Sequence, residues 1–143
     1  MLRKFHQSDI DPIINIWLEA SMKAHDFVDP EFWQSKVQDM REVYIPAAET
    51  YVYEDDVIKG FVSLCEDALA AIFVSPEFQG MGIGKQLMRK AKAVRNNLHL
   101  AVYKENTKSI EFYKKCGFEI QREQVDKHTG HVELVMKYTS KGK

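Results

Sequence analysis

The chain has 143 residues, of which 45% are hydrophobic and 29% charged, and its formal net charge is −1. This length predicts a single domain, residues 1–143, that is large enough to bury a core. The near-zero charge argues against an overall field that would draw the protein to nucleic acid or to a membrane surface. No apolar run approaches the roughly 20 residues that span a bilayer.

Two further features predict a reducing, cytoplasmic location. The first residues, from Met1 to Lys4, lead into polar sequence without the apolar segment of a secretory leader. Cys65 and Cys116 lie outside any CxxC pattern, so we expect buried free thiols. Nothing in the sequence indicates the oligomeric state.

The first half of the chain predicts a strand, two helices and a hairpin. A helix-start signal at Ser8 precedes apolar residues at helical spacing, and Asp29-Pro30 starts a second helix that should end at Pro46. The expected elements are a strand at 1–5, helices at 8–23 and 29–46, and strands at 50–54 and 57–64.

The second half alternates strands and helices. Residues 69–74 should form a central strand buried on both faces, because 71–74 are uniformly apolar. The remaining expected elements are helices at 82–95 and 106–116, strands at 98–103, 118–125 and 131–138, and a frayed basic tail at 139–143. The order β-α-α-β-β-β-α-β-α-β-β predicts a mixed α/β domain with a mixed sheet, an α+β arrangement.

A glycine-rich loop lies between the strand at 69–74 and the helix that follows it. Its sequence is Gln79-Gly80-Met81-Gly82-Ile83-Gly84. Glycines let the backbone approach a ligand closely, and the free N–H groups at the start of a helix attract anions. The order of strand, glycine loop and helix therefore predicts a site for a phosphate-bearing ligand.

Two common phosphate motifs fit this loop poorly. A Walker-type loop has Ser or Thr after Gly-Lys to hold magnesium, whereas Gln86 follows Gly84-Lys85 here. That residue speaks against a P-loop nucleotide hydrolase. A dinucleotide fingerprint has the spacing G-x-G-x-x-G after the first strand of its unit, whereas this loop has G-x-G-x-G after the fourth. A helix start that uses glycine only for packing is a third interpretation.

Two motifs together resemble the GNAT superfamily of N-acetyltransferases. The loop from Gln79 to Gly84 matches the pattern Q/R-x-x-G-x-G/A of that family. Downstream, Asn106 to Phe118 resembles its second signature, N-x-x-[SA]-x-x-[FL]-Y-x-x-x-G-F. The resemblance covers essentially the whole chain and implies the GNAT acyl-CoA N-acyltransferase fold. Near the N-terminus, the chain is similar to short bacterial YiaC-like members at Trp17-Leu18-Glu19, His25-Asp26-Phe27 and Phe32-Trp33.

The resemblance implies acetyl-CoA as the cosubstrate and assigns residues to bind it. The acetyl-pantetheine arm would lie along the strand at Ile72, Phe73 and Val74, with a backbone N–H near Phe73 and Val74 polarising the acetyl carbonyl. The pyrophosphate would be surrounded by the loop residues Gln79, Gly80, Met81, Gly82, Ile83, Gly84 and Lys85. Asn106 and Ser109 would face the cofactor slot from the next helix.

The same resemblance suggests Tyr113 as the general acid that protonates the coenzyme A thiolate. The plainer interpretation of Tyr113 is a core aromatic with a satisfied hydroxyl. For the base, Glu66 is the first candidate, His25 the second and water the third. Glu66 can equally be a surface turn acid, and His25 a polar helix-end residue. The histidines show no metal-ligand spacing, so we expect no metal.

The acceptor should be a primary amine, which attacks the thioester directly in a ternary complex. The candidates are a protein lysine, an N-terminal amine or a small amine, and acyl groups other than acetyl stay open. We expect an acidic mouth that suits a cation, made by Asp26, Asp29, Glu31, Glu66 and Asp67. The alternative function is a non-catalytic acyl-CoA sensor of the same fold.

Overall fold

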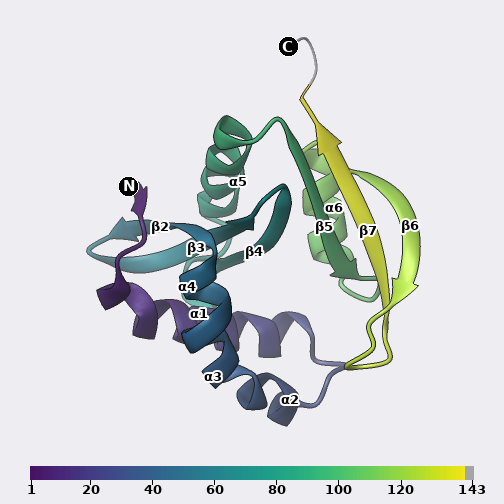
Figure 1. Cartoon of the computed structure of the whole chain (residues 1–143), viewed down its shortest axis with the longest axis horizontal. Coiled ribbons are helices and arrows are strands. Elements are labelled where there is room, and N and C mark those ends of the chain that lie inside the picture. The colour runs from purple at the N-terminus through teal and green to yellow at the C-terminus, as the bar shows by residue number, and fades with distance from the viewer. Residues whose placement is uncertain (141–143) are drawn as a thin grey trace.

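The computed structural model describes residues 1–140 and contains one seven-stranded sheet in the order β1-β2-β3-β4-β5-β7-β6 (Figure 1). The strands are β1 (Leu2–Lys4), β2 (Glu49–Asp55), β3 (Val57–Cys65), β4 (Ala68–Val74), β5 (Asn97–Tyr103), β6 (Glu119–Val125) and β7 (Val132–Thr139). The α-helices are α1 (Ile10–Ala24), α2 (Pro30–Ser35), α3 (Val37–Asp39), α4 (Ile45–Ala47), α5 (Ile83–Val94) and α6 (Thr107–Lys115). The predicted mixed α/β class is confirmed.

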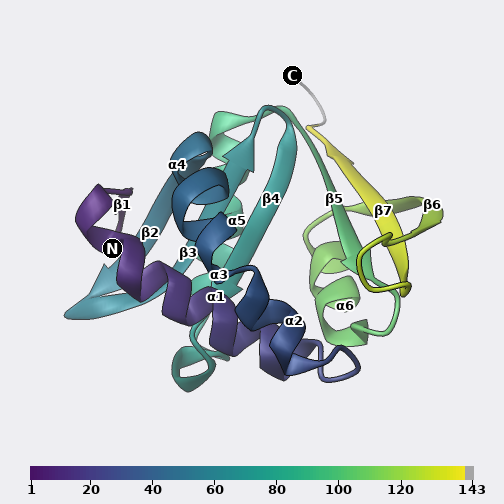
Figure 2. The same cartoon turned by 60° about the horizontal axis from the view of Figure 1, so that its bottom comes forward.

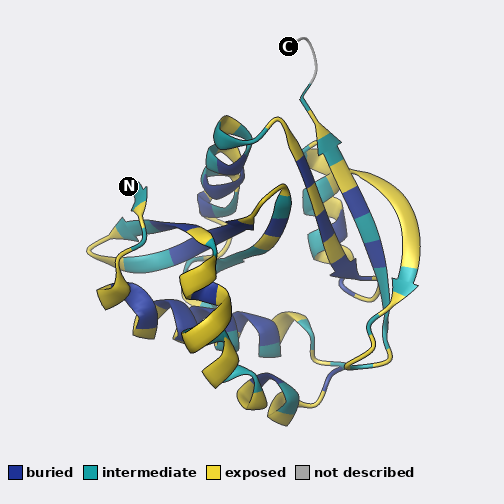
Figure 3. Cartoon of the chain, viewed as in Figure 1, coloured by how far each residue is buried: buried dark blue, intermediate teal, exposed yellow. Residues whose placement is uncertain are grey.

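Helices cover both faces of the sheet and bury two apolar clusters. On one face, α1 packs against β3 with Ile13, Trp17 and Phe61 in the core. On the other face, α5 packs against the same strand, and Val62 and Leu87 are buried there. Neighbouring residues of β3 thus serve opposite clusters, as the two-residue period of a strand requires. Figure 3 shows the resulting buried stripes along these elements.

The second expected helix is divided. α2 ends at Ser35, a turn at Lys36 follows, and α3 leads into a π-helical segment, Met40–Tyr44, before α4. The Lys36 N–H bonds to the Trp33 carbonyl, as in a tighter 3₁₀ turn. The helical region ends at Ala47, one residue beyond the end expected at Pro46, which lies in the first turn of α4.

β4 and β5 separate along their length, and this corrects the prediction for β4. The two parallel strands pair at Ala68 and His99 within the described residues, and then diverge (Figure 2). The expectation of a strand buried on both faces is wrong. Only Leu69 of β4 is buried, whereas Ile72, Phe73 and Val74 are half-buried because no strand lies beside them on that edge.

The cysteines and the chain end also differ from expectation. Cys65, at the end of β3, is exposed, so its predicted burial is wrong, and Cys116 is half-buried after α6. Burial raises the pKa of the Cys116 thiol. Thr139 ends β7 and the Ser140 N–H bonds to the Asn96 carbonyl, so these two residues do not belong to a frayed tail; residues 141–143, the rest of the expected tail, lie outside the described part. No helix within residues 1–140 is long and apolar enough to cross a membrane.

Candidate active site

The glycine loop turns the chain from β4 into α5 with two residues in the left-handed region. Gly80 has φ +83° and Gly82 has φ +82°, values that side chains with a Cβ rarely adopt. Gly82 precedes α5, and no side chain caps its first N–H groups. The first turn of α5 contains no acidic residue and includes Lys85. These free N–H groups and this positive charge favour an anion at the loop.

A cavity of about 890 Å³ extends from this loop along β4 to α6 and the end of α1. It brings together most of the predicted cofactor-binding residues. Those that line it are Ile72, Phe73, Val74, Gln79, Gly80, Gly82, Ile83, Gly84, Lys85, Asn106 and Ser109, together with Tyr113. Met81 is outside the lining, with 62% of its surface exposed.

The β4 edge inside the cavity offers main-chain hydrogen-bonding groups. β4 pairs with β3 along one edge, where Ser63 pairs with Ala71 and Leu64 with Leu69, so Ala70 is an extra, bulged residue. Beyond Ala68 the other edge has no partner strand in residues 1–140. The N–H and C=O groups of successive residues in a strand point to opposite edges. The unpaired edge of β4 therefore presents hydrogen-bonding groups that can bind an extended ligand containing amides.

Asn106 joins two walls of the cavity. Its Oδ1 accepts a hydrogen bond from the Ser109 N–H at 3.3 Å, which caps α6. Its Nδ2 lies 3.2 Å from Nε2 of His25, just beyond the end of α1. With Oδ1 used by Ser109, the amide donates to His25, so the neutral imidazole carries its proton on Nδ1. Asn106 therefore caps α6, and it also links α6 to the end of α1 through His25, a contact that the sequence did not predict.

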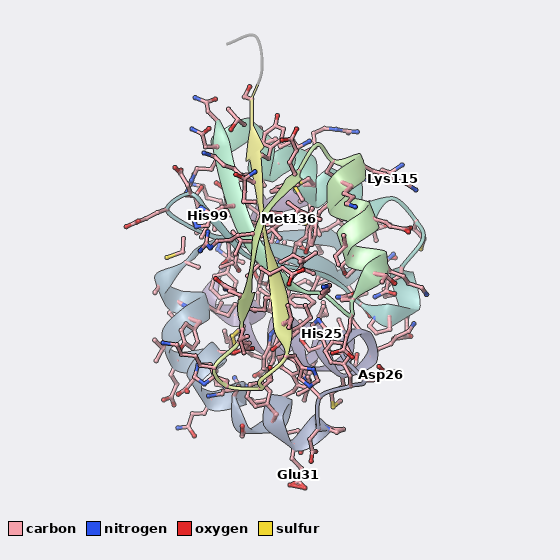
Figure 4. All side chains as sticks on the ribbon, turned by 90° about the vertical axis from the view of Figure 1, so that its right-hand side faces the viewer. His25, Asp26, Glu31, His99, Lys115 and Met136 are labelled. Carbon is pink, nitrogen blue, oxygen red and sulfur yellow. The ribbon has the colours of Figure 1, made fainter. Side chains whose placement is uncertain are left out.

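His25 is poorly suited to accept another proton. Burial lowers the pKa of His25 to about 4, and its Nδ1 is buried without a hydrogen-bond partner in the described residues. The ring lies 5.1 Å from each of the Trp33 and Tyr103 rings, measured between centroids. Figure 4 shows His25 and Asp26 beside the N-terminal end of α6. His25 thus lines the cavity as a neutral side chain.

Tyr113 reaches the cavity from α6. It is half-buried, and its ring lies 5.6 Å from Phe112 and 5.8 Å from Phe118 between centroids. Desolvation raises the pKa of the Tyr113 phenol above its ordinary value. The phenol is therefore protonated at neutral pH and has a proton to donate, although its raised pKa makes it a weaker acid than an ordinary tyrosine.

The structure does not bring Glu66 to this cavity. Glu66 occupies the β3–β4 turn with φ +55°, is exposed, and is absent from the cavity lining. Its carbonyl accepts a hydrogen bond from Arg95 Nε at 2.7 Å. Of the five carboxylates expected at an acidic mouth, Asp26 alone lines the cavity.

Other polar residues line the cavity without having been anticipated. They include Glu105 and Glu133, and also Tyr103 at the end of β5. The alternation of side chains along β5 predicts that Tyr103 shares a face with Ala101. No local sequence pattern predicts the pairing of β5 with β7, which places Glu133 beside Tyr103. Within residues 1–140, no group of three or more His, Cys, Asp or Glu side chains is arranged to hold a metal ion.

Known proteins are similar to this chain in sequence and in fold. The family described as an acetyltransferase (GNAT) domain matches residues 46–120. The peptidyl-lysine N-acetyltransferase YiaC of Escherichia coli (strain K12) is 36% identical over 122 residues, which are 84% of each chain. The spermidine N(1)-acetyltransferase of the same strain is 32% identical over 137 residues, covering 85% of this chain and 69% of that enzyme.

A solved structure extends the similarity to the arrangement of elements. Apo-form YjaB from Escherichia coli superposes with a TM-score of 0.84 at 26% identity, covering 98% of this chain and 97% of that one. The predicted fold and the predicted likeness to YiaC are confirmed. The chain therefore belongs to the GNAT family of acetyl-CoA-dependent N-acetyltransferases.

Proposed function

We propose that the protein transfers the acetyl group of acetyl-CoA to the ε-amine of lysine residues in proteins. The observation that carries this proposal is the separation of β4 from β5 at a cavity that the glycine loop and Tyr113 also line. YiaC, a relative at 36% identity, is a peptidyl-lysine N-acetyltransferase, which supports lysine as the acceptor. The need for acetyl-CoA supports a cytoplasmic location.

In this proposal the donor binds mainly through the main chain. The pyrophosphate lies at the loop from Gln79 to Gly84, where the uncapped N–H groups of α5 and the charge of Lys85 attract it. The pantetheine amides bind the free edge of β4 at Ile72, Phe73 and Val74. An N–H of the same edge then polarises the acetyl carbonyl and stabilises the oxyanion that develops. Met81, exposed on the loop, contributes through its backbone.

The amine attacks the carbonyl carbon in a ternary complex, and the tetrahedral intermediate expels coenzyme A. Tyr113 gives its phenolic proton to the departing thiolate, a role that contributes on the order of 10²- to 10⁴-fold in enzymes. Holding both substrates in one cavity removes much of the entropic barrier. Of the three base candidates expected from the sequence, His25 is engaged with Asn106 and Glu66 lies outside the cavity, so we assign the removal of the ammonium proton to the third, water.

One panel assay tests the proposal. Coenzyme A release is followed with acetyl-CoA and three acceptors: a lysine peptide with a blocked N-terminus, the same peptide with a free N-terminus and acetylated lysine, and spermidine. We expect turnover that depends on the free lysine. Binding of acetyl-CoA by calorimetry with no turnover on any amine would contradict the proposal and favour a sensor of acyl-CoA.

A further inference from the structure

A second cavity adjoins the first where β4 and β5 begin to separate. It has a volume of about 440 Å³. It shares five lining residues with the first cavity, which are Leu69, Ala70, Leu100, Ala101 and Glu133. The residues that belong to it alone are Ala68, His99, Arg122, Gln124 and Val135. The opening between the strands is therefore accessible from two cavities.

The second cavity belongs to the face of the sheet that α6 does not cover. Leu98, Leu100 and Met136 point into the core cluster that also contains Ile110 of α6. By strand alternation, His99 of β5 points to the other face, as does Val135 of β7. Figure 4 shows this arrangement, with His99 and Lys115 of α6 on opposite sides of the strands. This face therefore gives access to the opening between β4 and β5 without passing the glycine loop.

Glu133 occupies the boundary between the two cavities. It is half-buried, and of the described residues that line the second cavity it is the one carboxylate. Its Oε1 accepts a hydrogen bond from Gln124 Nε2 at 2.9 Å, and Gln124 in turn accepts one from Arg122 at 3.4 Å. No described residue donates to the other oxygen, Oε2. The carboxylate is held in place with one oxygen free to accept a hydrogen bond from a cation.

We propose that Glu133 binds the ammonium group of the acceptor as it enters through the second cavity. The inference rests on the proposed function and names the residue that selects the substrate. Arg122, the permanent cation on the same wall, disfavours further positive charges behind the first. The cavity therefore suits a side chain with a single cation, such as lysine in a protein, over a polyamine.

The first experiment compares Glu133→Gln with wild type on two acceptors. One is a lysine peptide, which is cationic at pH 7.5, and the other is an aniline, which is neutral there. We expect KM for the peptide to rise about tenfold, because roughly one charge-assisted hydrogen bond is lost. The kinetics on the aniline and the affinity for acetyl-CoA should stay unchanged. Glu119→Gln, on the exposed strand β6 and outside both cavities, is the matched control and should behave as wild type.

Two results would overturn the role of Glu133. An unchanged KM for the peptide would mean that the ammonium binds elsewhere, and an equal loss on the peptide and the aniline would mean that Glu133 only supports the structure through Gln124. Both results leave the proposed activity of the wild-type protein standing. If wild type acetylates no amine, the proposed function itself fails, which is a distinct outcome.

The second experiment tests the preference for one charge. Arg122→Gln should raise kcat/KM for spermidine several-fold while leaving the aniline unchanged, whereas Arg122→Lys keeps the charge and should resemble wild type. A wild-type enzyme that uses spermidine as efficiently as the lysine peptide, with no change in Arg122→Gln, would contradict the single-cation cavity.

Discussion

The two sides of the β4–β5 opening are built in different ways. The donor side, formed by residues 72–85 and by α6, comes from two continuous stretches and offers mainly backbone groups and a helix N-terminus. The proposed acceptor side, the second cavity, is lined by residues of β4, β5, β6 and β7, which are brought together by strand pairing. A binding site formed by main-chain groups of a continuous segment can be predicted from the local sequence. A site formed by side chains on neighbouring strands depends on the tertiary fold.

The largest effect expected on the donor side is from Gly84→Glu. An added Cβ at Gly84 would meet the Phe112 ring at 3.5 Å and Val74 at 3.9 Å, both ordinary contacts, so the chain should fold. The longer carboxylate would extend into the cavity and repel the pyrophosphate. We expect acetyl-CoA affinity to fall at least 100-fold by calorimetry, with an unchanged circular dichroism spectrum.

Gly84→Ala is the control for Gly84→Glu, because it adds the Cβ without the charge. It should retain acetyl-CoA binding within a few-fold. Retained binding by Gly84→Glu itself would show that the pyrophosphate does not lie at this loop, and the donor side would have to be placed elsewhere.

Tyr113→Phe tests whether the donor side also supplies the acid. We expect kcat to fall tenfold or more while the Kd for acetyl-CoA stays nearly the same, because only the proton donor is lost. Since desolvation raises the pKa of Tyr113, the wild-type rate should show no decline from this group up to about pH 9. Phe112→Leu, which alters a neighbouring aromatic without a hydroxyl, is the comparison variant. An unchanged kcat in Tyr113→Phe would remove Tyr113 from the mechanism.

The difference between the two sides explains what could be predicted. Gly80 and Gly82 need φ values that glycine alone adopts readily, so the loop is visible in sequence. Asn106 and Tyr113 occur at helical spacing, and their common face follows from the period of the helix. Glu133, in contrast, is one acid within an ordinary strand. Its position depends on the pairing of β7 with β5, which involves residues 30 positions apart.

Two errors have the same origin. The apolar run of β4 has the composition of a fully buried strand, but burial requires a neighbour on each side, and β5 diverges after Ala68. Glu66 precedes β4 in sequence, yet the turn directs it outside the cavity. In both cases the outcome depends on the tertiary arrangement, which the local sequence pattern does not encode.

His25 links α1 to α6 across the first cavity, and its titration should be visible in the stability of the fold. In the folded state the pKa of His25 is about 4, below its ordinary value of 6.5, so the unfolded chain binds a proton more readily between these values. Stability should therefore fall as pH falls from 6.5 towards 4. Between pH 7 and pH 5, the free energy of unfolding of His25→Gln should fall by about 1–2 kcal/mol less than that of wild type. Urea unfolding at the two pH values measures this difference.

Gln at position 25 keeps an acceptor for Asn106 but does not titrate, so the change isolates the proton. If His25→Gln loses as much stability between pH 7 and pH 5 as wild type does, other groups cause the acid sensitivity and His25 is not the neutral link between α1 and α6.

The smallest effect is expected at Glu66, and it tests whether a residue outside both sides contributes to catalysis. The carboxylate is exposed on the β3–β4 turn, away from both cavities, so Glu66→Gln should change kcat for the lysine peptide by less than about twofold. The measurement is a pH–rate profile, in which a direct base would produce an acidic limb that disappears in the variant. A tenfold loss of kcat together with the loss of that limb would restore Glu66 as the base. It would also show that the turn moves to the cavity when the substrates bind, because the geometry described above gives the carboxylate no access to the amine.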